Sequence, residues 1–233
     1  MNVGIDIGNT RIKYYLFDHG KLEEKVFGYK DIPWKKINNI IVVRTGKPDK
    51  RLEKLLREQS EKVLYVSPGI NLPFEILYES DTLGADRIAL VAGAKLLYGN
   101  NILVIDAGTC ITYDYLDAES KYLGGAISPG IEMRYRALHD YTAGLPLLKF
   151  DEKLPPLIGK RTDLSIHSGV IHGVLKEIEG LIVDYRKQYP GIKIVLTGGN
   201  AKFLSKSLKI KIFAIQKFLL AYGLKIISDL NRR

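Results

Sequence analysis

The chain has 233 residues, of which 46% are apolar and 26% are charged, and its formal charge at pH 7 is +9. This composition is typical of a globular protein and excludes a disordered, collagen-like or fibrous chain. Charged residues interrupt every apolar segment before it reaches the roughly 20 residues that a membrane-spanning helix needs.

The remaining features of the composition concern location and partners. The N-terminus lacks the basic segment and long apolar segment of an export signal, so we expect a cytoplasmic protein. The single cysteine, Cys110, cannot form an internal disulfide, which fits a reducing compartment. Lysine and arginine form no long block, and no zinc-finger spacing or RNP motif occurs. We therefore expect a charged small molecule as substrate and no nucleic-acid partner.

The first predicted element is a β-hairpin at the N-terminus. An apolar strand over residues 2–7 leads into Gly8-Asn9-Thr10, and β-branched and aromatic residues continue over residues 11–16. Segments of this kind on either side of a glycine-containing turn are typical of a hairpin.

A strand, a helix and a second strand are predicted after the hairpin. Residues 40–43 and 63–66 are short apolar segments, and residues 50–62 between them carry leucines at helical spacing. This order predicts that the two strands pair in parallel. A further helix is predicted over residues 85–97, where the apolar residues fall on one face.

Residues 103–116 resemble the N-terminal hairpin. Both segments consist of an apolar strand, an Asp-x-Gly turn, an Asn or Thr and a second strand, and they lie 100 residues apart. Such an internal repeat predicts two structurally similar α/β halves. We place the boundary near residues 98–101, which gives an N-terminal lobe of residues 1–98 and a C-terminal lobe of residues 99–233.

Three further elements are predicted in the second half. They are a long helix over residues 167–188, a strand over residues 192–196 and a C-terminal helix over residues 214–227. The strand runs directly into Thr-Gly-Gly-Asn at residues 197–200. Paired glycines would let a flat ligand lie against the backbone, although many strands end in such turns.

The two Asp-x-Gly turns are candidates for phosphate binding. Glycine lets the backbone approach a ligand, and a neighbouring hydroxyl and amide add hydrogen-bond donors to the backbone N–H groups. Asp6 ends a buried strand, and a hydrated Mg²⁺ beside the phosphates would compensate its charge, while Lys13 adds a positive charge. An ordinary hairpin whose Asp caps its own turn is the alternative, but the second copy at Asp106 favours phosphate binding.

Six separated motifs carry a resemblance to known families. In chain order, three segments resemble the two phosphate motifs and the adenosine motif of the acetate-kinase, sugar-kinase, Hsp70 and actin superfamily: residues 6–10, 106–109 and 197–200. Three others are similar to motifs of type III pantothenate kinase: Gly84-Ala85-Asp86-Arg87, Gly124-Gly125-Ala126-Ile127-Ser128-Pro129-Gly130 and Thr142-Ala143-Gly144-Leu145-Pro146. Together the motifs cover most of the chain.

The resemblance implies an α/β fold with two ribonuclease-H-like lobes, as in actin-like ATPases, and a nucleotide cleft between them. It also implies a phosphotransferase that uses ATP to convert pantothenate to 4'-phosphopantothenate, the first step of coenzyme A biosynthesis. The implied cofactors are Mg²⁺ and a monovalent cation, K⁺ or NH₄⁺. The implied active unit is a homodimer.

The resemblance assigns roles residue by residue. Asp86 would be the general base that accepts the proton of the attacking hydroxyl. Asp106 would bind the monovalent cation, and Asp6 would bind Mg²⁺ directly or through water. The residues implied to bind ATP are Asp6, Ile7, Gly8, Asn9, Thr10, Arg11, Ile12, Lys13, Thr109, Gly198 and Gly199. The residues implied to bind pantothenate are Tyr78, Gly84, Ala85, Asp86, Arg87 and Thr162.

Four of these positions also have plain structural interpretations or depart from the family pattern. Without the resemblance, Asp86 and Arg87 would be interpreted as a helix cap followed by an ion pair. Thr162 falls where the family has a threonine that reaches pantothenate from the partner subunit, and it could equally be a turn residue or an N-cap. Tyr78 stands six residues before Gly84 without a proline between them. The family usually has seven residues and a proline.

Two other functions remain as alternatives. Relatives described as accessory transcription factors share the fold, so a non-enzymatic regulator is one of them. A kinase of another small hydroxyl compound is the other. The presence of Asp6, Asp86 and Asp106 favours catalysis, because a binding module needs no general base.

Overall fold

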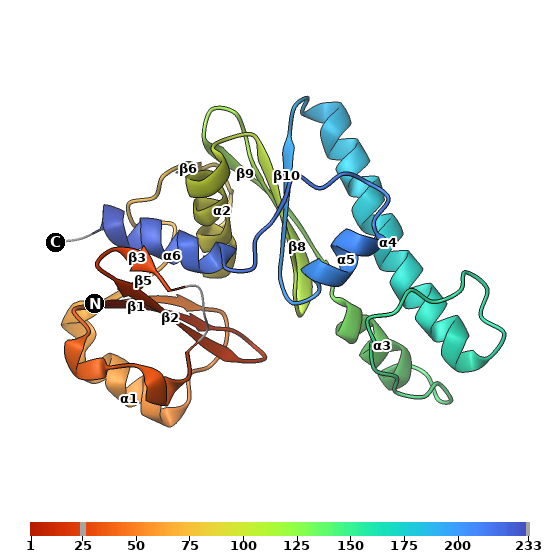
Figure 1. The fold of residues 1–233 in the computed structure, drawn as a ribbon, viewed down its shortest axis with the longest axis horizontal. Helices are drawn as coiled ribbons and strands as arrows, with labels where there is room; N and C mark the ends of the chain where they lie inside the picture. The colour runs from red at the N-terminus through yellow and green to blue at the C-terminus, as the bar shows by residue number, and fades with distance from the viewer. Residues whose placement is uncertain (24–26, 232–233) are drawn as a thin grey trace. The chain divides into compact units, whose positions relative to one another are not determined.

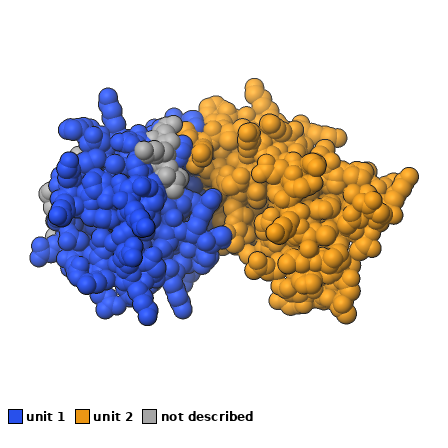
Figure 2. Space-filling view, turned by 60° about the horizontal axis from the view of Figure 1, so that its bottom comes forward, with its two compact units in different colours: residues 1–102, 115–124, 218–233 blue, residues 103–114, 125–217 orange. Residues whose placement is uncertain are grey.

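The computed structural model describes residues 1–23 and 27–231. The chain forms two compact units, coloured separately in Figure 2. Unit 1 consists of residues 1–102, 115–124 and 218–233, and unit 2 consists of residues 103–114 and 125–217. Residues 232 and 233, which end the expected C-terminal lobe, lie outside the described residues.

Unit 1 contains a five-stranded sheet in the order β3-β2-β1-β4-β5. Strands β1 and β2 pair antiparallel, with Asp6 opposite Lys13, which confirms the N-terminal hairpin. Strand β4 pairs in parallel with both β1 and β5, as predicted for the strand, helix and strand unit. The strands are β1 (Asn2–Ile7), β2 (Ile12–Asp18), β3 (Lys21–Leu22), β4 (Asn39–Arg44) and β5 (Val63–Tyr65).

Helix α1 (Lys50–Glu58) covers part of this sheet's core. Its N-cap is Asp49, whose carboxylate accepts the N–H of Leu52 at 2.8 Å. Leu52 and Leu56 are buried in the same cluster as the apolar residues of β1 and β4. The predicted helix ends earlier than residue 62, because a short 3-10 turn follows at Ser60–Lys62. Two more 3-10 turns lie at Tyr29–Asp31 and Trp34–Lys36.

Helices α2 (Ala85–Tyr98) and α6 (Leu219–Leu230) lie side by side in unit 1 (Figure 1). Helix α2 is buried over residues 87–94, which explains its nearly continuous run of small and branched apolar residues. The predicted helix over residues 85–97 is therefore confirmed. Packing against α6 fixes the axis of α2, whose first turn carries Asp86.

The second sheet has six strands in the order β11-β10-β7-β8-β9-β6. Its order β8-β7-β10 repeats the order β2-β1-β4 of the first sheet, which confirms the predicted internal repeat. Strand β8 begins in unit 2 and ends in unit 1, and strand β9 begins in unit 1 and ends in unit 2. The strands are β6 (Glu75–Ile76), β7 (Ile102–Ala107), β8 (Cys110–Leu116), β9 (Lys121–Pro129), β10 (Lys193–Thr197) and β11 (Ala214–Ile215).

The helices of unit 2 are α3 (Ile131–Asp140), α4 (Thr162–Gln188) and α5 (Ala201–Ser207). The predicted helix over residues 167–188 thus begins five residues earlier, at Thr162. The start predicted for the C-terminal helix, residue 214, is wrong. Ala214 and Ile215 form a strand on the edge of β10, and this pairing outweighs their helical spacing.

Two expectations about the whole chain concern its lobes and its surroundings. Because α6 packs on α2, the compact units differ in their bounds from the contiguous lobes of residues 1–98 and 99–233, whose division stays a prediction. Among the helices of residues 1–23 and 27–231, none has the length and apolarity needed to cross a membrane.

Candidate active site

The turn between β1 and β2, here called the first turn, comprises residues 8–11. The N–H of Gly8 donates to the carbonyl of Arg11 at 3.2 Å and closes the turn. Asn9, Thr10 and Arg11 are exposed, whereas Asp6 at the end of β1 is only 6% exposed. The turn therefore offers polar backbone and side-chain groups to a ligand, with a buried carboxylate beneath them.

Asp6 and Lys13 form an ion pair at this turn. The Lys13 Nζ donates to Asp6 Oδ2 at 3.0 Å from the facing position of β2. A buried carboxylate needs a partner of opposite charge, and Lys13 provides one from within the chain itself. Sequence reasoning placed both side chains beside phosphates, and the structure shows that they also contact each other.

Asp86 is the second residue of helix α2, whose N-cap is Gly84. Its Oδ1 accepts the N–H of Arg87 at 2.9 Å, and a Cβ on Gly84 would lie 2.6 Å from the same oxygen. Burial raises the pKa of the Asp86 carboxyl, the hydrogen bond from Arg87 opposes this, and the like charge of Asp6 adds to the rise. A carboxylate with a raised pKa is a better proton acceptor than an exposed one.

Tyr78 and Arg87 lie next to each other in unit 1. The Arg87 guanidinium carbon is 5.7 Å from the centroid of the Tyr78 ring, and Arg87 is only 4% exposed. The structure thus brings Tyr78 to the start of α2 even though the usual proline is missing. Four of the residues assigned to pantothenate by resemblance, Tyr78, Gly84, Asp86 and Arg87, meet in one region.

The turn between β7 and β8, here called the second turn, comprises residues 108–110. The N–H of Gly108 donates to the carbonyl of Cys110 at 2.9 Å, and Thr109 between them is exposed. The N–H of Gly130, at the start of α3, donates to the Thr109 carbonyl at 3.1 Å. The Gly-Gly-x-x-x-Pro-Gly motif therefore ends against the second turn.

Asp106 and Gly198 meet beside the second turn. Gly198 has φ of +95°, and a Cβ on it would overlap Asp106 Oδ1 and the Ala107 carbonyl oxygen. The N–H of Asn200 donates to the same carbonyl at 3.0 Å. The carboxylate and carbonyl oxygens around this glycine are the kind of ligands that a hard cation prefers.

Glu177 of α4 is the centre of a polar network in unit 2. It accepts hydrogen bonds from the Tyr113 hydroxyl at 2.8 Å, the Ser128 hydroxyl at 3.0 Å and the Arg134 guanidinium. Arg134 Nε also donates to the Pro129 carbonyl at 2.9 Å. Burial would raise the pKa of Glu177, but these hydrogen bonds lower it. Sequence reasoning missed the network, because its members lie on four elements and share no spacing.

Thr162 is the first residue of α4 and follows the N-cap Arg161. It lines an open groove of about 720 Å³ together with apolar residues such as Leu138, Leu145 and Ile166. All of these residues belong to unit 2.

No group of three or more His, Cys, Asp and Glu suited to a metal occurs in the part of the chain that the structure describes. Nucleotide-bound Mg²⁺ does not need such a group, because phosphates and water fill most of its coordination sites and one or two carboxylates suffice. The buried Asp6 below the first turn fits this requirement.

A family model described as type III pantothenate kinase matches residues 30–184, which is more than half of the chain. The chain belongs to the type III pantothenate kinase family. Two members of this family match it almost from end to end. The type III pantothenate kinase of Flavobacterium johnsoniae is 41% identical over 98% of this chain and 100% of its own. That of Christiangramia forsetii is 43% identical over 100% of this chain and 99% of its own.

Similar solved structures have the actin-like ATPase and sugar-kinase fold, which confirms the expected α/β fold class. A Baf family transcriptional activator from Campylobacter jejuni has a TM-score of 0.64 at 26% identity, and the match covers 98% of both chains. The activator of the 2-hydroxyisocaproyl-CoA dehydratase from Clostridium difficile, solved with bound ADPNP, has a TM-score of 0.52 at 13% identity. This second match covers 98% of the present chain and 95% of the activator.

Proposed function

We propose that the protein transfers the γ-phosphoryl group of ATP to the primary hydroxyl of pantothenate, the first step of coenzyme A biosynthesis. Its membership of the type III pantothenate kinase family supports the substrate. The observation that carries the chemistry is Asp86, a partly buried carboxylate whose pKa is raised, at the start of α2 beside Arg87. This is the setting that a general base requires.

The proposed reaction is a direct displacement at phosphorus. The hydroxyl oxygen bonds to the γ-phosphorus while the bond from that phosphorus to the β,γ-bridging oxygen breaks, and ADP leaves. Asp86 accepts the hydroxyl proton as the new bond forms. Gly84 leaves room for the Asp86 carboxylate, and the N–H of Arg87 fixes its orientation.

The nucleotide is proposed to bind the residues of the two turns and of the Thr-Gly-Gly-Asn segment. In unit 1 these are residues 6–13, whose exposed turn and Lys13 suit phosphate oxygens. In unit 2 they are Thr109, Gly198 and Gly199. Mg²⁺ bound to the phosphates at Asp6 would offset negative charge on the transferred group. Lys13 would then be shared between Asp6 and the phosphates.

The monovalent cation, K⁺ or NH₄⁺, is proposed to bind at Asp106. The close approach of Gly198 to the Asp106 carboxylate and the Ala107 carbonyl supports this site, since only a residue without a Cβ leaves those oxygens accessible there.

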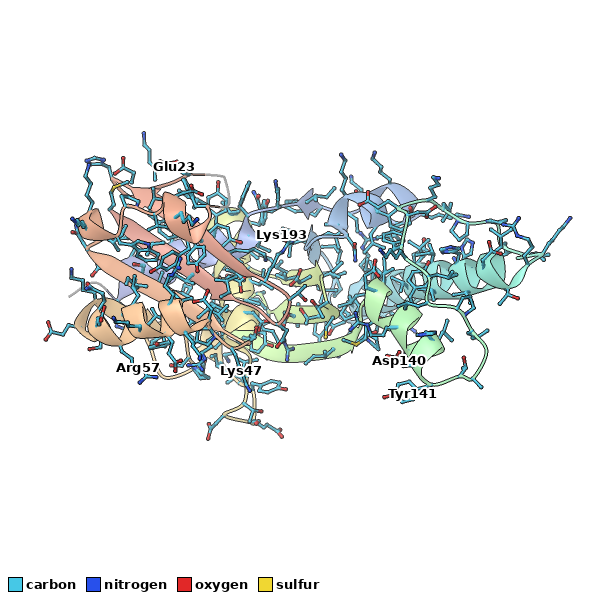
Figure 3. All side chains as sticks on the ribbon, turned by 90° about the horizontal axis from the view of Figure 1, so that it is seen from below. Glu23, Lys47, Arg57, Asp140, Tyr141 and Lys193 are labelled. Atoms are coloured by element: carbon cyan, nitrogen blue, oxygen red, sulfur yellow. The ribbon has the colours of Figure 1, made fainter. Side chains whose placement is uncertain are left out.

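Replacing Asp106 by Asn should abolish activation by the cation. The amide keeps the size of the side chain but loses the negative charge that attracts a monovalent ion. The measurement is the initial rate as a function of K⁺ concentration at constant ionic strength. Asp140→Asn is a matched control, because Asp140 is exposed at the end of α3 (Figure 3). Unchanged K⁺ activation in Asp106→Asn would place the cation elsewhere.

Pantothenate is proposed to contact Tyr78, Gly84, Ala85, Asp86 and Arg87 of one subunit and Thr162 of its partner in a homodimer. The groove at the start of α4 supports this, because Thr162 opens to solvent there beside apolar residues. Leu157 and Ile158, just before this helix, are 76% and 75% exposed. Exposed apolar surface of this kind is typical of an interface.

Mixing two inactive variants should restore activity if the site is shared. Asp86→Asn loses the base, and Thr162→Trp blocks the contact from the partner, so each homodimer is inactive. In a mixed dimer one of the two sites has both native residues, so random exchange should restore about a quarter of all sites. The measurement is activity after verified subunit exchange, with each variant alone as the control. No recovery, or full activity of a demonstrated monomer, would disprove the shared site.

The proposed activity is tested with the purified wild-type chain. ATP consumption is measured with pantothenate and with a panel of other small hydroxyl compounds, with and without K⁺, and the phosphorylated product is identified by mass spectrometry. We expect 4'-phosphopantothenate as the main product. Faster turnover of another compound would favour the alternative kinase, and no ATP consumption with any compound would contradict the proposal.

A non-enzymatic regulator is the second candidate, because the Campylobacter jejuni protein with a TM-score of 0.64 is named as a transcriptional activator. The same assay separates the two. A regulator without catalysis would leave ATP intact in the presence of pantothenate, whereas the raised pKa of Asp86 favours turnover.

A further inference from the structure

A turn directly after β4 lies against the first turn in unit 1. The N–H groups of Thr45 and Gly46 both donate to the Ile7 carbonyl, at 3.0 and 2.8 Å. A Cβ on Gly46 would overlap the Gly8 carbonyl oxygen and would lie 3.2 Å from the backbone nitrogen of Asn9. The backbone that follows β4 therefore approaches the first turn so closely that only glycine fits at position 46.

A related arrangement occurs in unit 2. Thr197 ends β10 and Gly198 follows it, whereas Thr45 and Gly46 both follow β4, and β10 neighbours β7 as β4 neighbours β1. The N–H of Asn200 donates to the Ala107 carbonyl at 3.0 Å, and Ala107 is the counterpart of Ile7 in the repeat. The internal repeat thus includes a Thr-Gly turn in each unit, of which sequence reasoning found only the second.

We propose that Gly46 is a positioning residue for nucleotide binding, because it holds the first turn where its N–H groups meet the phosphates. The proposal rests on the proposed function, since residues 8–10 are assigned there to ATP. It extends the nucleotide site to a segment outside the sequence motifs, immediately before Lys47, which is labelled in Figure 3.

The expected effect of a side chain at this position follows from the geometry. A methyl group on Gly46 can be admitted only if the backbone of Gly8 and Asn9 moves, because its nearest neighbours are backbone atoms and not a flexible side chain. Hydrogen bonds weaken steeply when donors leave their ideal geometry. Losing one hydrogen bond to a charged phosphate oxygen costs roughly tenfold or more in affinity, so we expect at least about a tenfold loss of ATP affinity.

The test uses Gly46→Ala with Gly69→Ala as the matched control. Gly69 is in the same unit, and a Cβ on it would have no atom within 4 Å. Binding of a non-hydrolysable ATP analogue with Mg²⁺ is measured by calorimetry, and KM values for ATP and pantothenate are measured separately. We expect Gly46→Ala to weaken analogue binding and raise the KM for ATP at least about tenfold, with the KM for pantothenate within about twofold.

Several outcomes overturn the proposal. One is analogue affinity within about twofold of wild type in a folded Gly46→Ala variant. A second is an equal loss of analogue affinity in Gly69→Ala. A third is a Gly46→Ala variant that loses activity while both KM values stay unchanged, which is the result expected if Gly46 is merely structural. If wild type binds the analogue but does not phosphorylate pantothenate, the proposed function fails while the calorimetric comparison still decides this inference. No binding by wild type overturns both.

A second measurement decides the case in which Gly46→Ala does not fold. Amide hydrogen exchange is followed in the wild-type chain with and without the analogue and Mg²⁺. The amides of Thr45 and Gly46 are bonded to the carbonyl of Ile7, which directly precedes the first turn, so a nucleotide that holds this turn in place should also slow their opening. The proposal expects slower exchange at Thr45 and Gly46 together with Gly8 to Thr10. Protection of the first turn alone would overturn it.

Discussion

Asp86→Asn is expected to lower kcat by about 10²–10⁴-fold, because the amide keeps the shape of the side chain but cannot accept the hydroxyl proton. The fold should be unaffected, since the amide oxygen can still accept the N–H of Arg87. The measurement is kcat with saturating ATP and pantothenate. Asp81→Asn is the matched control, because Asp81 is exposed in the same unit just before α2.

The pH dependence of the wild-type chain gives an independent test of Asp86. A base acts only when it is deprotonated, so kcat/KM should fall as the pH drops through its pKa. Burial and the like charge of Asp6 raise that pKa, so the fall should begin at a higher pH than for an exposed carboxylate. A kcat of Asp86→Asn near the wild-type value would exclude Asp86 from the mechanism.

Gly223→Ala is expected to lower the free energy of unfolding by about 3 kcal/mol or more, because the added methyl meets backbone and not a movable side chain. A Cβ on Gly223 would overlap the Ala89 carbonyl oxygen and would lie 3.1 Å from the Ala89 Cα. Helix α6 would have to move away from α2 along their shared surface. The measurement is urea-induced unfolding followed by circular dichroism.

The control for this prediction is Gly180→Ala in the middle of α4. A Cβ there has no atom within 4 Å, so alanine should be neutral or should stabilise the helix by up to about 1 kcal/mol. A Gly223→Ala variant with wild-type stability would show that the two helices can separate without cost. The activity of Gly223→Ala should fall in proportion to the fraction of unfolded protein, since α2 carries Asp86.

Local patterns in the sequence predicted the parts of the site that depend on few residues. Both hairpins, the parallel pair of β4 and β5 and the start of α2 at Ala85 follow from glycine positions and hydrophobic periodicity. The resemblance then supplied residue roles, which no spacing could have supplied. The internal repeat was visible because its Asp-x-Gly turns are short and similar.

Contacts between distant segments were the parts that the sequence did not predict. The start of α6 was wrong because Ala214 and Ile215 pair with β10, which lies about 20 residues earlier in the chain. The Glu177 network has its partners 43 to 64 residues away. A Thr-Gly pair as short as Thr45-Gly46 has no distinctive pattern until the structure places it against the first turn.

The placement of α6 in unit 1 has a consequence for how the chain is made. Unit 1 begins at residue 1 but needs residues 218–233, so the ribosome must synthesise all of unit 2 before the surface of α2 can be covered. Domains often fold during synthesis in N-terminal order, at about 5–20 residues per second. Here the helix that carries the proposed base receives its packing partner last. A nascent or prematurely terminated chain without α6 would therefore carry Asp86 on a helix that lacks its main packing partner, so catalysis would begin only after α6 has been synthesised.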